Sequence, residues 1–134
     1  MSKYIAPLIH LKNLCIENGI PCETLTGSVT MSDRTKIIEQ FNKDHAYKVL
    51  LIQLDVGKEA LTLPAAGFTL FLDRNYTPGV NAQAEMRMAP IDGSACTKYV
   101  MDLVMKGTVE ERIHNILVTR KTAIRNVNSV FESE

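Results

Sequence analysis

Apolar residues recur along the chain in two patterns, one typical of amphipathic helices and one typical of buried strands. Residues 4–18 carry apolar side chains every three to four positions, which predicts a helix ending at Gly19. A second helix is predicted to begin near Ser32 or Asp33, both common N-cap residues, and to reach about Asn42.

Two further helices are predicted in the second half of the chain. The first is short and covers residues 80–88. The second is predicted to begin after Thr108, because Thr108 and Glu111 have the spacing of a capping box, and to reach Phe131. Its apolar stripe consists of Ile113, Ile116, Leu117, Ile124 and Val127.

Four short segments have strand patterns. Residues 49–52 and 68–72 are continuous apolar runs, as in strands buried on both faces of a parallel sheet. Residues 22–25 and 97–104 are the other two candidates. Because strands alternate with helices, we expect an α/β domain with a mostly parallel sheet. Ligands bind at the carboxyl ends of such strands, so the segments of interest are 26–30, 53–63, 73–79 and the approach to residue 106.

Composition narrows the class of protein. A chain of 134 residues with 46% hydrophobic and 22% charged residues suits a single globular domain over residues 1–134. It has neither an apolar run of roughly 18 residues nor a signal-peptide pattern, so we expect no membrane association and an intracellular location, cytoplasmic or nuclear. Fifteen basic residues balance fifteen acidic ones. Any contact with nucleic acid is therefore expected to be one local strip or to be shared with another domain.

Metal and thiol chemistry receives little support from the sequence. The three cysteines form no C-x-x-C pair, and the three histidines stand apart from one another. We therefore interpret the cysteines as reduced thiols and the histidines as ordinary surface or core residues, and we predict no metal ligands.

Several segments, in order along the chain, match one family pattern. Leu25-Thr26-Gly27-Ser28 is followed at fixed spacing by Arg34, Ile37, Ile38 and Phe41. Gln83-Ala84-Glu85-Met86-Arg87 fits a Q-A-x-x-R motif, and Gly107-Thr108-Val109-Glu110-Glu111 opens the last helix. Together these segments resemble the C-terminal RecA-like lobe of Swi/Snf-type superfamily 2 helicases and ATPases.

The resemblance implies a three-layer RecA-like, P-loop NTPase-like fold. In that family two lobes face each other across a cleft, and the second lobe completes an ATP site while contacting DNA. ATP and Mg²⁺ are held mainly by the first lobe, which this chain would need as a partner in cis or in trans. Carried over by position, the resemblance assigns catalysis to Arg87, nucleotide binding to Gly57, Gln83 and Arg87, and nucleic-acid binding to Thr26, Gly27, Ser28 and Lys58.

The departures from the family pattern matter as much as the match. In the segment that corresponds to motif V, only Gly57 and Leu63 remain. Pro90 stands where the second arginine of motif VI is expected, and proline cannot replace a guanidinium. No G-x-x-x-x-G-K-[ST] phosphate loop is present. We therefore expect impaired ATP turnover unless Arg87 takes over, and no activity from the chain alone.

The N-terminus also departs from the pattern. The family's second lobe opens with a strand before its first helix, and Met1-Ser2-Lys3 is too short to form it. The sheet should therefore lack its first strand and keep two edges with unpaired backbone groups. We expect a fragment of a two-lobe protein or a split-gene product, which pairs with another chain or, through an unpaired sheet edge, with its own copy.

Three interpretations remain open. The first is a second lobe of a DNA-dependent ATPase, and the second is a degenerate lobe that only binds DNA or protein. The third is an unrelated doubly wound domain that binds a small ligand. At the level of residues, Arg87 also fits a helix arginine paired with Glu85 or Asp92, and residues 26–28 also fit a plain β-turn.

Overall fold

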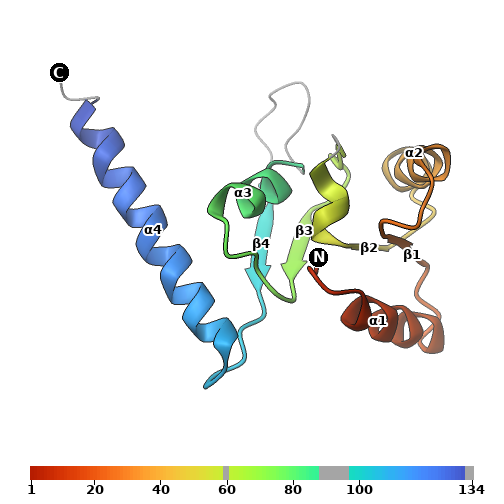
Figure 1. Cartoon of the computed structure of the whole chain (residues 1–134). Coiled ribbons are helices and arrows are strands. Elements are labelled where there is room, and N and C mark those ends of the chain that lie inside the picture. The colour runs from red at the N-terminus through yellow and green to blue at the C-terminus, as the bar shows by residue number, and fades with distance from the viewer. Residues whose placement is uncertain (59–60, 88–96, 132–134) are drawn as a thin grey trace.

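The computed structural model describes residues 1–58, 61–87 and 97–131, with side chains up to Arg120 apart from positions 57, 58 and 78. Helices and strands alternate along the chain, as predicted (Figure 1). The elements in order are α1 (Ile5–Glu17), β1 (Cys22–Leu25), α2 (Met31–Glu39), the π-helical turn η1 (Gln40–Asp44), β2 (Val49–Ile52), the 3-10 helix η2 (Leu54–Lys58), β3 (Phe68–Phe71), α3 (Pro78–Met86), β4 (Tyr99–Asp102) and α4 (Val109–Phe131).

The strands form two parallel pairs. β1 pairs with β2, with Cys22 opposite Val49, and β3 pairs with β4, with Phe68 opposite Tyr99. The prediction of a parallel α/β domain is therefore confirmed. The bounds of β1 and β2 are those predicted, whereas the last two strands are shorter than the segments 68–72 and 97–104.

The two strand pairs are joined only by the first residues of the chain. The Ser2 N–H donates to the Ile52 carbonyl at the end of β2, with an N–O distance of 3.1 Å. The Met1 ammonium donates to the Leu70 carbonyl of β3 at 2.5 Å. Since β2 and β3 do not pair with each other, the expected interruption of the sheet lies between them.

Asp73, which follows β3, holds this N-terminal segment in place. One carboxylate oxygen accepts a hydrogen bond from the Ser2 hydroxyl, and the other accepts from the Lys3 N–H at 2.7 Å. Ser2 is fully buried. The carboxyl end of β3 is thereby fixed to the start of α1.

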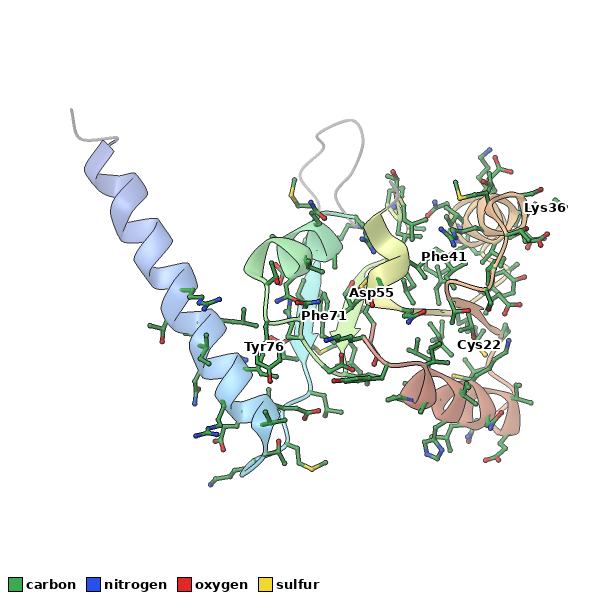
Figure 2. The ribbon with its side chains drawn as sticks, in the orientation of Figure 1. Cys22, Lys36, Phe41, Asp55, Phe71 and Tyr76 are labelled. Carbon is green, nitrogen blue, oxygen red and sulfur yellow. The ribbon has the colours of Figure 1, made fainter. Side chains whose placement is uncertain are left out.

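Two apolar clusters form the core. Leu25, Ile52, Leu61 and Leu63 make the first, beneath α2. Leu54, Phe71 and Ala84 make the second, where η2 and α3 meet β3. Figure 2 shows Phe71 in the middle of the molecule, and its side chain has no exposed surface. Met1 packs against both clusters and so links the two halves of the core.

The predicted start of α2 is wrong by two or three residues. Thr30 is the N-cap, and its hydroxyl oxygen accepts a hydrogen bond from the Asp33 N–H at 3.2 Å. Ser32 and Asp33 therefore lie within the helix. α2 continues into η1, which ends at His45 in the left-handed conformation with φ of 49°.

The ends of α3 and α4 also differ in detail from the prediction. α3 begins at Pro78, two residues before the predicted start, since proline suits the first turn of a helix. At the start of α4, the Thr108 hydroxyl donates to the Met105 carbonyl, and Glu111 accepts from the Gly107 N–H. The capping box was therefore predicted with the wrong partners.

α4 has the predicted length, and it extends away from the rest of the fold (Figure 1). Ile113 and Leu117 of its predicted apolar stripe are buried, whereas Ile116 is 44% exposed. The side chains of Ile124 and Val127 lie outside the described part. No helix in the described ranges combines the length and apolar character needed to cross a bilayer.

Candidate functional site

The segments that correspond to motifs V and VI meet in the structure. η2 and α3 contact each other over the buried Phe71. Beyond η2, the Leu63 N–H donates to the carbonyl of Arg87 at the end of α3, with an N–O distance of 2.7 Å. Gly57, which lies in η2, and Arg87 therefore belong to adjoining segments of one edge.

Arg87 is the C-cap residue of α3, and only 8% of it is exposed. Burial lowers the pKa of its guanidinium from the ordinary value, because desolvation disfavours the charged form. Arginine nevertheless stays protonated near neutral pH. The edge therefore contains a buried positive charge, which suits an anionic ligand.

Gln83 lies four residues before Arg87 and is exposed. Residues four apart share one face of a helix, so Gln83 is placed where it can reach the same neighbourhood as Arg87. The side chain of Lys58, and the whole of Pro90 and Asp92, lie outside the described part.

Residues 26–29 form a tight turn at the carboxyl end of β1. The Val29 N–H donates to the Thr26 carbonyl at 3.1 Å, and the hydroxyl oxygens of Thr26 and Ser28 lie 2.8 Å apart. The Gly27 N–H donates to the side-chain oxygen of Gln53 at 3.3 Å. The turn therefore lies next to the residue that precedes η2, while its Gly27 amide already has a partner.

Arg34 supports this turn from below. Its guanidinium donates to the Val29 carbonyl at 3.2 Å, and the residue is 7% exposed. This contact gives Arg34 a structural role.

Sequence reasoning missed the importance of Arg74. Its guanidinium donates to Glu85 of α3 at 2.6 Å and to Asp102 of β4 at 2.5 Å. The guanidinium carbon also lies 3.7 Å from the centroid of the Phe71 ring. Arg74 therefore holds α3 against the sheet and so positions Arg87. The available signal was two carboxylates at element ends near an arginine that directly follows a strand.

The fit to the expected cofactors is partial. A buried guanidinium and an exposed amide on α3 suit the phosphates of a nucleotide. Among the described residues, no group of His, Cys, Asp and Glu side chains has the arrangement of a metal site. The residues present thus fit an edge of an ATP site, with Mg²⁺ bound by groups outside this chain.

The sequence matches the helicase conserved C-terminal domain family over residues 2–91. It is 31% identical over 123 residues to the DNA repair protein RAD5A of Arabidopsis thaliana, which covers 92% of this chain and 12% of that protein. It is 32% identical over 104 residues to the putative ATP-dependent helicase/translocase YwqA of Bacillus subtilis, which covers 78% of this chain and 11% of that protein.

A solved structure, that of the C-terminal part of the Fun30 ATPase domain, has the same fold. It superposes with a TM-score of 0.78 at 22% identity, covering 87% of this chain and 37% of that one. The chain thus spans only about an eighth of the length of the two curated relatives. By its sequence match, the chain belongs to the helicase conserved C-terminal domain family, as a RecA-like lobe of Swi/Snf type.

Proposed function

We propose that this chain is the second lobe of a DNA-dependent ATPase and completes an ATP site when it joins a first lobe. The observation that carries the proposal is the buried guanidinium of Arg87 at the end of α3. The Arg87 carbonyl is bonded to the Leu63 N–H, which follows η2, so the two motif-bearing segments are held together.

Arg87 would act on the transferring phosphoryl group of ATP. Charge builds on the phosphoryl oxygens in the transition state, and a fixed cation in a site with little water stabilises that charge. Gln83 would orient the nucleotide from the same helix face, and Gly57 would let the backbone of η2 approach it. Arg74 would keep α3 in register with the sheet through its two carboxylate partners.

DNA would contact the turn at the end of β1. The hydroxyls of Thr26 and Ser28 can donate to phosphate oxygens, with Gly27 leaving room for the backbone and Lys58 adding one charge. Because the net charge of the chain is zero, these contacts would be local and shared with the first lobe. ATP and Mg²⁺ would be held mainly by that lobe, inside the cell.

The test joins this chain to a first lobe of the same family and measures DNA-stimulated ATP hydrolysis. Arg87→Lys and Arg87→Ala should lower kcat by about 100-fold or more, because a lost transition-state contact acts on the chemical step. Lys36→Ala is the matched control, since Lys36 points outward from α2 (Figure 2). Unchanged kcat in both Arg87 variants, with the assembly intact, would contradict the proposal.

A degenerate lobe that binds DNA or protein is the alternative, and Pro90 favours it, since proline stands where an arginine is expected. The same assembly carrying Pro90→Arg distinguishes the two functions. Turnover by the unaltered chain supports the enzyme. Turnover that appears only with Pro90→Arg supports the degenerate lobe.

A further inference from the structure

An apolar groove separates β2 from β3. It encloses about 410 Å³ and is lined by both strands, by Leu8 and Leu11 of α1, and by Phe41. Figure 1 shows the N-terminus at one end of this groove, between the two strands. The groove is therefore an interruption of the sheet with an apolar lining.

The β2 edge of the groove has backbone groups available for pairing. Val49 and Gln53 donate their N–H groups toward Pro21 and β1. Because successive peptide groups of a strand point in opposite directions, those of Leu50 and Ile52 face the groove. Within the described part of the chain, the N–H groups of these two residues have no backbone partner.

The β3 edge has the same property. Gly67 and Phe71 accept hydrogen bonds from the β4 side, through the N–H groups of Tyr99 and Leu103. By the same alternation, Phe68 and Leu70 face the groove. Among the residues described, no backbone group accepts a hydrogen bond from either of these amides.

The first two residues define the direction and register of any strand that enters. Ser2 is bonded to β2 on one side, and Met1 is bonded to Leu70 and Leu72 of β3 on the other. Both residues run parallel to their neighbours. The groove is therefore one strand wide at this end, and a parallel strand entering it must end at the Met1 ammonium.

We propose that the groove binds, in trans, the C-terminal residues of another polypeptide, as a parallel apolar strand whose α-carboxylate meets the Met1 ammonium. The strand would span about four residues, the length of β2 and of β3. Its last residue would pair with Leu50 and Ile52, and the residue before it with Phe68 and Leu70. Such pairing is strand addition to an open sheet.

Two observations favour a separate polypeptide with an apolar end. The ammonium lies at the mouth of an apolar groove, where a carboxylate is its natural counter-charge. A second copy would have to insert the sequence Phe131-Glu132-Ser133-Glu134, and two carboxylate side chains do not suit an apolar lining. The inference is independent of the proposed ATPase, since it requires neither nucleotide nor DNA.

The test uses the peptide Lys-Lys-Val-Val-Ile-Val with a free carboxylate, titrated calorimetrically into the full chain. The matched controls are the same peptide with a C-terminal amide and the reversed sequence with a free carboxylate. Near the pKa of about 6 of the ammonium, the acid should bind about tenfold more tightly than either control. It should also protect the amides of Leu50, Ile52, Phe68 and Leu70 from hydrogen exchange.

Acetylation of Met1 removes the charge and fills the last strand position, so it should reduce affinity for the acid peptide at least tenfold, whereas Lys36→Ala should leave it unchanged. Three results would overturn the inference. The first is absence of binding by the acid peptide. The second is equal binding of the acid and the amide. The third is protection of the four amides without peptide in a chain that sediments as a dimer.

Discussion

At the scale of single residues, Arg74 carries more of the structure than any other described cation. Its side chain is only 10% exposed, and it joins Glu85 and Asp102 while it lies against the Phe71 ring. These partners come from three elements, so the guanidinium acts as a bonded centre beneath α3.

Replacement by Arg74→Met should lower the free energy of unfolding by about 2 kcal/mol, because two half-buried carboxylates lose their partner. The midpoint of urea unfolding measures the loss. Lys43→Met is the control: the Lys43–Glu39 pair is 3.6 Å long with side chains 74% and 59% exposed, so its removal should change stability by less than about 0.5 kcal/mol. Equal losses in the two variants would show that Arg74 is not a special contact.

The Met1 ammonium gives stability a pH dependence of its own. Burial lowers its pKa from 8.0 to about 6, against the opposing effect of the Asp73 carboxylate. Between these values the unfolded chain binds a proton that the folded chain does not, so stability falls as the pH falls from 8 to 6.

The expected loss over that interval is about 1 kcal/mol, after allowance for the partial exposure of the group. Urea unfolding at both ends of the interval measures it. The chain acetylated at Met1 has no titrating ammonium, so its stability should change less over the same interval. Parallel pH profiles for the two forms would contradict this assignment.

At the scale of elements, the α2 cap tests how local chemistry sets a boundary. Thr30→Ala removes the hydroxyl that receives the Asp33 N–H and should cost about 1 kcal/mol of stability. Thr30→Ser keeps the hydroxyl and should retain most of that stability. Urea midpoints for the two variants provide the comparison, and an equal loss in both would mean that the hydroxyl is not the cap.

Element types were predictable from the sequence, while several boundaries were not. Continuous apolar runs such as Val49–Ile52 identify buried strands with their correct ends. The start of α2 was misjudged because Thr30, Ser32 and Asp33 are all good caps, and only the backbone conformation selects among them. Arg74 was overlooked because its partners lie 11 and 28 residues away, beyond any local pattern.

At the scale of the whole molecule, the sequence correctly indicated the parallel fold and the interruption of its sheet. The candidate site was predictable only as a set of positions. The bond between Leu63 and the end of α3, and the burial of Arg87, depend on how η2 and α3 pack over Phe71. Periodicity reports which face of an element is apolar, but it does not report which two elements meet.

The N-terminal junction between the strand pairs also determines the order in which the molecule can assemble. Its contacts join residues 69 to 71 positions apart, so a long loop must close before they form. The pairing of β1 with β2, by contrast, needs a shorter loop. Each half can therefore fold on its own time course, and the union of the halves is the slow, final step of refolding.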